Sequence, residues 1–80
     1  MKIIVTLTNK IQCTDYQLDN DMIIKDALKI IEENDSFNLP DNLQYIYSSR
    51  SKKKVSIYYS FKQAKIYSGD IILIESGGEK

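Results

Sequence analysis

The chain of 80 residues has no histidine, no tryptophan, one cysteine and one proline. The absence of histidine excludes a Ser–His or Cys–His catalytic pair and a zinc site built from cysteine and histidine. The single cysteine, Cys13, cannot form an internal disulfide. Side chains that commonly carry enzymatic chemistry are therefore scarce, and we expect a protein that is not an enzyme and acts through its surfaces.

Charge of one sign is also missing, because 11 Lys and Arg residues balance 11 Asp and Glu residues. A strong overall field that would attract nucleic acid or an acidic membrane is absent, which leaves only local patches to consider. No apolar run is longer than four residues, whereas a membrane-spanning helix needs about 20. Met1-Lys2 is followed by a short alternating segment instead of the apolar stretch of a signal peptide. We therefore expect no membrane insertion and a cytoplasmic location.

The length and composition fit one small globular domain. Apolar residues make up 42% of the chain and charged residues 28%, a balance that is typical of a soluble folded protein. A chain of this size buries roughly 60–65% of the surface that its unfolded form exposes, enough for one core. No repeat or linker divides the sequence, so we expect a single domain over residues 1–76 and a short polar tail over residues 77–80.

The first half of the chain has the pattern of a hairpin followed by a helix. Residues 2–8 alternate apolar and polar side chains, which predicts a half-buried strand. Residues 11–18 can return as its partner, and their apolar side chains change face between Cys13 and Tyr16, which predicts a bulge there. The acceptor side chains at residues 19–21 indicate a helix start. The apolar stripe of this helix is Ile24, Ala27, Leu28 and Ile31.

The second half of the chain adds three strands over residues 43–47, 55–59 and 71–74. The last of these is an unbroken apolar run, which favours a position in the middle of a sheet, beside the first strand. One helix stripe covers only one sheet face, which predicts a two-layer α+β fold. A right-handed crossover through the helix is expected to place the third strand parallel to the first. This arrangement is a β-grasp, the ubiquitin-like fold, with a mixed sheet of four to five strands and one main helix.

Two stretches of the chain resemble ubiquitin: the opening residues 1–10 and the ending, with Ser60-Phe61 and residues 66–74. The closer resemblance is to the YukD/EsaB family, small bacterial ubiquitin-like accessory proteins of type VII (WXG100) secretion. This resemblance is carried by Asp15-Tyr16-Gln17-Leu18, by the helix segment over residues 24–31, and by Gly69-Asp70 before a terminal Ile/Leu strand. It extends over nearly the whole chain.

The resemblance implies a non-catalytic adaptor or regulatory protein that works through protein–protein contacts and uses no cofactor. The partner that it implies is the cytoplasmic part of a secretion membrane protein or the secretion ATPase. We expect the chain to be a monomer or a weak homodimer.

Gly77-Gly78 supports an alternative function, because ubiquitin and the sulfur carriers of similar fold end in Gly-Gly. Their terminal carboxylate is adenylated in a narrow enzyme channel, through which only residues without β-carbons can pass. Here Glu79-Lys80 would first have to be removed, and only Glu75-Ser76 separates the glycines from the last predicted strand. A ubiquitin-like modifier or sulfur carrier is therefore the alternative.

A basic cluster is the first candidate protein-interaction site; its members are Arg50, Lys52, Lys53 and Lys54, on a predicted exposed turn. Nucleic-acid sites pair such cations with stacking aromatic side chains, and Tyr47, Tyr58 and Tyr59 flank the cluster. The balanced net charge nevertheless favours an acidic patch on a protein partner over nucleic acid.

An apolar group is the second candidate site. Ile4, Ile46 and Leu73 are predicted to point away from the helix, on adjacent strands of one sheet face. An exposed group of this kind is typical of a partner surface. We therefore expect protein binding on this face, with the basic turn steering the encounter.

Overall fold

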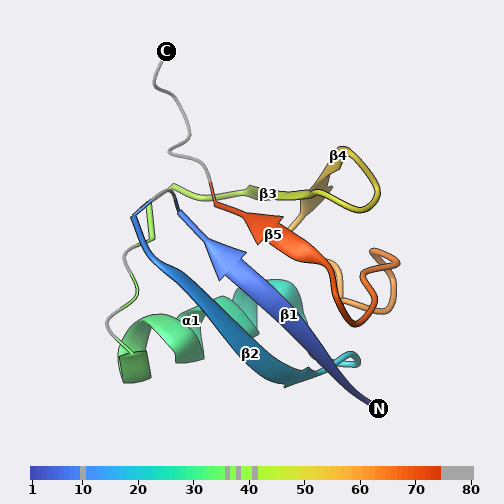
Figure 1. Cartoon of the computed structure of the whole chain (residues 1–80), viewed down its shortest axis with the longest axis horizontal. Coiled ribbons are helices and arrows are strands. Elements are labelled where there is room, and N and C mark those ends of the chain that lie inside the picture. Colours follow the sequence, from blue (N-terminus) through green and yellow to red (C-terminus); the bar gives the residue numbers. More distant parts are fainter. Residues whose placement is uncertain (10, 36, 38, 41, 75–80) are drawn as a thin grey trace.

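The computed structural model describes residues 1–9, 11–35, 37, 39–40 and 42–74, which form one sheet and one helix (Figure 1). The elements in chain order are β1 (Lys2–Thr8), β2 (Cys13–Asp19), α1 (Ile24–Asp35), β3 (Tyr45–Ser48), β4 (Lys53–Ser56) and β5 (Ile71–Leu73). The five strands form the sheet in the order β2-β1-β5-β3-β4. The last strand therefore lies in the middle, which confirms the prediction made from its unbroken apolar run.

The sheet is mixed. β1 pairs antiparallel with β2 and parallel with β5, and β5 pairs antiparallel with β3. β3 consequently runs antiparallel to β1, so the prediction that these two strands are parallel is wrong. The helix connects β2 to β3, and the crossover therefore makes β3 parallel to β2. Because α1 covers only one face of the sheet (Figure 1), the two-layer α+β β-grasp architecture is confirmed.

The register of β1 and β2 is continuous over all seven residues of each strand, so the predicted bulge is wrong. Ile11 is not part of the strand but lies in the turn, where it is 87% exposed. The Asn9 side-chain oxygen forms this turn by accepting the backbone N–H groups of Ile11 (3.0 Å) and Gln12 (2.7 Å). Cys13, which opens β2, is exposed.

The first turn of α1 is tied to the segment that follows β4. The backbone N–H groups of Ile24 and Lys25 donate to the carbonyls of that segment at 2.9 and 2.8 Å. Asp19 accepts the N–H of Asp21 (3.1 Å) before the helix begins, and this hydrogen bond holds the pKa of Asp19 below its usual value. The predicted stripe is buried against the sheet: Ile24, Ala27, Leu28 and Ile31.

The hydrophobic core lies between α1 and the sheet face that the helix covers. Strand alternation puts every second residue of β1 into it, and Phe37 and Phe61 fill it from the connecting segments. The buried core residues are Ile3, Val5, Leu7, Ile24, Ala27, Leu28, Ile31, Phe37, Ile46, Val55, Ile57, Phe61, Ala64, Ile66, Ile72 and Ile74. The helix layer and the sheet layer therefore share one contiguous core.

Ile46 belongs to this core, so its predicted position on the open sheet face is wrong. It is 1% exposed and lies opposite buried Val55 in the β3–β4 register. The alternation of β3 instead places Tyr45 and Tyr47 on the open face, where Tyr45 is 55% exposed. Placing Ile46 outward, as the sequence analysis did, puts Tyr45 and Tyr47 on the inward face, because neighbouring residues of a strand point to opposite sides. A tyrosine carries a polar hydroxyl, however, and the aliphatic Ile46 is the side chain whose full burial costs no hydrogen bond.

Candidate protein-binding surface

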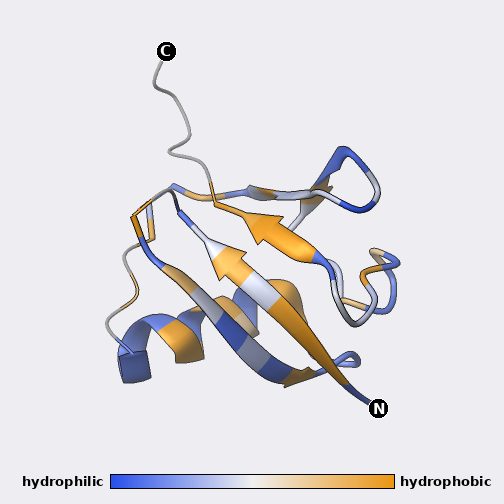
Figure 2. Cartoon of the chain, viewed as in Figure 1, coloured by the Kyte–Doolittle hydropathy of each residue, from blue (hydrophilic) through white to orange (hydrophobic). Residues whose placement is uncertain are grey.

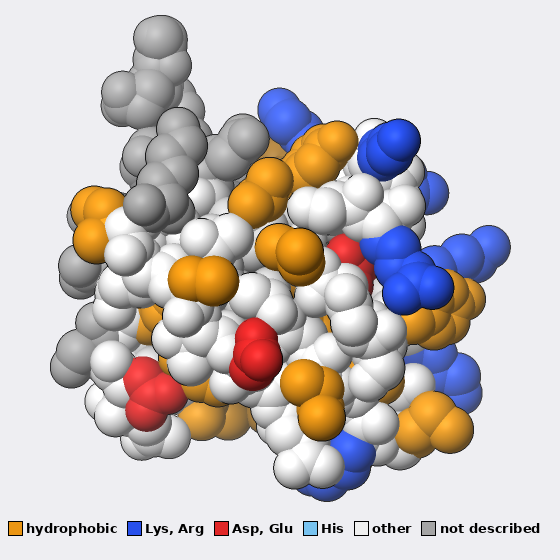
Figure 3. Space-filling model, in the orientation of Figure 1, with side chains coloured by type: hydrophobic (Ala, Val, Ile, Leu, Met, Phe, Trp, Pro, Cys, Tyr) orange, Lys and Arg blue, Asp and Glu red, His pale blue; other side chains and the backbone are white. Residues whose placement is uncertain are grey.

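The sheet face that α1 leaves open, here called the outer face, carries a group of apolar and aromatic side chains. We call this group the outer patch; its members are Ile4, Tyr45, Tyr47, Ile71 and Leu73. Each alternates with a buried neighbour along its strand, which directs it outward. Hydropathy colouring shows β5 as hydrophobic along its length (Figure 2), and the space-filling view of this face shows hydrophobic side chains between polar ones (Figure 3).

The outer patch crosses three neighbouring strands. Leu73 of β5 lies opposite Tyr47 of β3 and, on its other side, opposite Thr8 of β1. Ile71 lies opposite Thr6. Side chains at such directly opposed positions are in reach of one another. The patch therefore rests on paired strands and not on loops, so its shape is fixed before a partner arrives.

Exposure of the outer patch is high for aliphatic side chains. Ile4 is 52% exposed and Ile71 is 45% exposed, whereas Leu73 and Tyr47 are half-buried. Burying such groups against a partner is favourable at roughly 25 cal/mol per Å² of apolar surface removed from water. The patch therefore provides the apolar centre that a protein interface requires.

The turn before β5 joins the outer patch to the basic cluster. The N–H of Ile4 donates to the Ser68 hydroxyl (2.9 Å), and the Ile4 carbonyl accepts the N–H of Gly69 (2.8 Å). Gly69 has a φ of +93°, a conformation that favours glycine. The Arg50 guanidinium Nη1 donates to the Ser68 carbonyl at 3.5 Å. One turn thus holds an exposed apolar residue and a cation side by side.

The four cations of the basic cluster lie in the β3–β4 turn and at the start of β4, and all are exposed. Lys54 is opposite Tyr47 in register and so belongs to the outer face, whereas Lys53 is opposite inward-facing Ser48. Lys52 occupies the turn with a φ of 58°. No ion pair of these cations occurs within the described part of the chain. Within the basic cluster, Arg50 and Lys54 are therefore the two cations that border the outer patch.

A buried carboxylate holds the basic turn in place. Asp70 is 1% exposed and accepts the Ser48 hydroxyl at 2.6 Å and the backbone N–H of Arg50 at 3.1 Å. The Ser48 oxygen in turn accepts the N–H of Ser51 (3.2 Å). Hydrogen bonds to an ionised acceptor are stronger than neutral ones, especially away from water. Asp70 therefore fixes where Arg50 leaves the sheet.

The structure brings together some of the sequence-predicted site residues and separates others. Ile4, Leu73 and Arg50 lie on or beside one face, and Lys52 and Lys53 extend beyond it at the turn, while Ile46 is in the core. The sequence reasoning missed three members of the patch: Tyr45, Tyr47 and Ile71. The sequence does contain a signal for them. Tyr45 and Tyr47 flank Ile46, and Ile71 precedes Ile72, so placing Ile46 and Ile72 inward would have placed all three on the outer face.

The charge of the outer face changes from one side to the other. On the β2 side, Asp15 is exposed and accepts the Thr6 hydroxyl at 2.6 Å. On the opposite side, Lys and Arg side chains gather where the β3–β4 turn and the segment before β5 lie (Figure 3). The apolar residues are therefore bordered by an acid at one side and by cations at the other, which favours one orientation of a bound partner.

The described residues contain neither a candidate metal site nor a membrane-spanning helix. No group of three or more Cys, Asp or Glu side chains there could hold a metal ion. No helix within the described ranges is long and apolar enough to cross a membrane. Gly77-Gly78 and Glu79-Lys80, on which the modifier or carrier alternative depends, lie outside the described residues, as does the end of the expected domain at residue 76.

Comparison with known proteins gives the fold but no closer relative. No protein-family model and no curated protein sequence matches the chain. Among solved structures, the chain is similar to the C-terminal ubiquitin-like domain of mouse tubulin-specific chaperone e, with a TM-score of 0.68, 13% identity, and coverage of 99% of this chain and 90% of that one. It is also similar to the N-terminal ubiquitin-like domain of the 4931431F19Rik protein, with a TM-score of 0.70, 14% identity, and coverage of 99% and 78%. The chain therefore has the ubiquitin-like β-grasp fold.

Proposed function

We propose that this ubiquitin-like domain is a non-catalytic adaptor that binds a protein partner through the outer patch. The observation that carries the proposal is the juxtaposition of exposed Ile4 and Ile71 with Arg50 on a rigid sheet face. Apolar side chains supply affinity, while bordering cations supply orientation and a faster encounter. The matching partner surface has an apolar centre and carboxylates on the side that meets Arg50 and Lys54.

The system that we propose for this adaptor is bacterial type VII (WXG100) secretion, with a cytoplasmic location. This part rests on the resemblance to the YukD/EsaB family. Its supporting segments occupy ordered elements: Asp15-Tyr16-Gln17-Leu18 lies within β2, residues 24–31 form most of α1, and Gly69-Asp70 makes the turn before β5. The proposed partner is the cytoplasmic region of a secretion membrane protein or the secretion ATPase.

A pair of matched substitutions tests the surface. Ile71 of the outer patch and Ile30 of α1 are both 45% exposed, so Ile71→Asp and Ile30→Asp make the same chemical change on opposite layers. We expect Ile71→Asp to weaken partner binding by at least about tenfold, as a buried contact at the centre of an interface does. Ile30→Asp should leave binding unchanged. Circular dichroism of both variants reports whether the fold is kept.

The assay is binding of the purified chain to the purified cytoplasmic regions of the secretion membrane proteins and ATPase from the same genome. Equal binding by the wild type and Ile71→Asp would reject the outer patch as the docking surface. Absence of binding to every one of these regions would reject the secretion assignment.

A further inference from the structure

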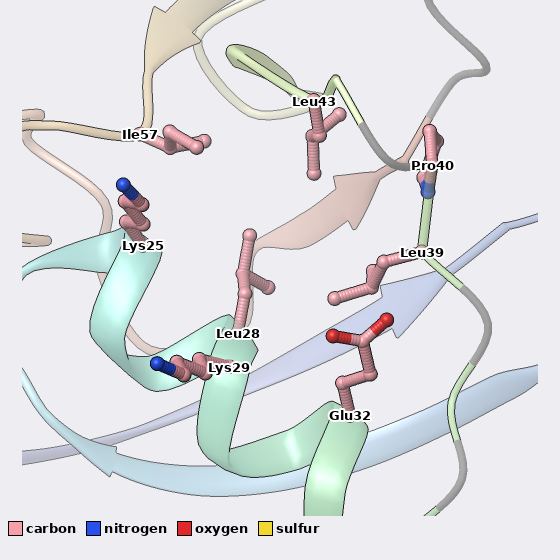
Figure 4. Close-up of a pocket in the computed structure, with 8 residues that line it drawn as sticks. All are labelled: Lys25, Leu28, Lys29, Glu32, Leu39, Pro40, Leu43 and Ile57. Atoms are coloured by element: carbon pink, nitrogen blue, oxygen red, sulfur yellow. The ribbon is translucent and has the colours of Figure 1, made fainter.

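A second candidate site lies on the other layer of the molecule, between α1 and the segment that leads into β3. It is a cavity of about 290 Å³ whose apolar wall is formed by Leu28, Leu39, Pro40, Leu43 and Ile57. In Figure 4 the leucine side chains and Ile57 converge on one space, with charged side chains around its mouth. The cavity is about twice the volume of an engineered apolar cavity that binds benzene. It is therefore large enough for one aliphatic side chain but not for a large ligand.

The mouth of the cavity has an uneven charge. Lys25 and Lys29, one helical turn apart on α1, line one side, and Glu32 lines another (Figure 4). Both lysines are exposed, and neither makes an ion pair within the residues that the structure describes. Among the described residues that line it, the cavity mouth thus has two cations without an ion pair and one carboxylate, and its lysine side complements an anionic ligand.

The lysine side of the cavity is held in position. The Lys25 ammonium lies over the Tyr58 ring, 5.2 Å from its centroid, a favourable cation–π arrangement. The Lys25 backbone N–H donates to the Ile57 carbonyl at 2.8 Å, which ties the helix to the cavity wall. Because this carbonyl occupies the N–H, the positive charge at the mouth comes from the side chains and not from the helix end.

We infer that this cavity binds a short acidic peptide segment of a protein partner, with one aliphatic side chain in the cavity and carboxylates against Lys25 and Lys29. A peptide fits better than a free aliphatic acid because Lys25 and Lys29 lie one helical turn apart and complement two separate carboxylates, whereas a free aliphatic acid carries only one. The cavity faces away from the outer patch, across the sheet. The domain can therefore hold two partners at once, which goes beyond the single interface proposed above.

The test uses the full chain labelled with ¹⁵N and three acetylated, amidated peptides: Glu-Glu-Leu-Glu-Glu, Glu-Glu-Ala-Glu-Glu and Lys-Lys-Leu-Lys-Lys. We expect the leucine-containing acidic peptide to shift the amide signals of Leu28, Leu43 and Ile57, with a dissociation constant on the order of 0.1–1 mM for so small a contact. The alanine peptide and the basic peptide should bind at least about tenfold more weakly, since one lacks the anchor and the other has the wrong charge.

Charge variants separate this cavity from the outer patch. Lys25→Gln with Lys29→Gln should weaken the acidic peptide about tenfold, whereas Lys52→Gln with Lys54→Gln removes the same charge elsewhere and should have no effect. Equal binding of the leucine and alanine peptides, or shifts confined to the outer patch, would overturn the proposal. So would octanoate shifting the cavity signals while the leucine peptide does not. None of these results depends on whether the outer patch binds a partner.

Discussion

Replacement of Asp70 by alanine tests whether the buried carboxylate stabilises the fold and the basic turn. The change removes the acceptor for the Ser48 hydroxyl and the Arg50 N–H, and hydrogen bonds to charged groups contribute about 1.5–3 kcal/mol each. Part of this loss is offset, because a carboxylate no longer has to be taken out of water. We expect Asp70→Ala to lower the free energy of unfolding by about 3 kcal/mol.

That loss is large for this chain. A domain of 80 residues has a free energy of unfolding of about 4–12 kcal/mol, at roughly 0.05–0.15 kcal/mol per residue. At about 4–8 °C per kcal/mol for small domains, Tm should fall by about 12–24 °C. Asp70→Asn keeps one acceptor and can donate its amide to Ser48, so it should cost only about 1 kcal/mol.

Urea unfolding followed by circular dichroism measures these differences. The matched control is Asp15→Ala, which also deletes a 2.6 Å hydrogen bond from a hydroxyl, but at an exposed site. Water replaces the lost partner there, so we expect a loss below about 1 kcal/mol. If Asp70→Ala and Asp15→Ala cost the same, burial does not strengthen the Asp70 contacts and the reasoning fails.

Three further predictions follow from the described contacts and from the C-terminal sequence. Ile46→Ala should lower the free energy of unfolding by about 2–5 kcal/mol, and Tyr45→Ala by under about 1 kcal/mol; the reverse order in urea unfolding would contradict the β3 orientation. Partial burial and the Asp35 carboxylate raise the pKa of the Tyr16 hydroxyl, so its contribution to stability is present below pH about 10 and is lost as pH rises through the folded pKa. Tyr16→Phe should remove a high-pH component of the ultraviolet tyrosine titration, and an unchanged curve at high pH would contradict this. Because the proposed adaptor function does not use Gly77-Gly78, the mass of the protein isolated from cells should include Glu79-Lys80, whereas their removal would favour the modifier or carrier alternative.

The fold could be predicted because aliphatic residues repeat with the periods of its elements. The two-residue alternation of Ile3, Val5 and Leu7 defined β1, and the unbroken run over 71–74 placed the last strand centrally. The turn at Ile11 was harder to predict from the sequence. Strand prediction assumes that aliphatic side chains are buried, whereas Ile11 is 87% exposed. The predicted bulge came from counting that residue as part of the strand.

The site was predicted only in part, because tyrosine is an ambiguous marker of burial. Tyr45 and Tyr47 looked like an inward face, which put Ile46 outside and left Ile71 unnoticed. Asp70 looked like an ordinary turn residue, and nothing local shows that Ser48, 22 positions earlier, becomes its partner. The cavity likewise lies between α1 and the distant residues Leu43 and Ile57. No pattern in the sequence indicates that these segments come together.

The central position of β5 sets an order for how the protein can be made. β5 lies between β1 and β3 and pairs with both, so among the described strands it alone links the β1–β2 pair to the β3–β4 pair. During synthesis, the N-terminal hairpin and α1 emerge while the sheet still lacks its middle strand. Native pairing across the whole sheet must therefore wait until residue 73 has left the ribosome, and until then the facing edges of two half-sheets stay open to the wrong strands.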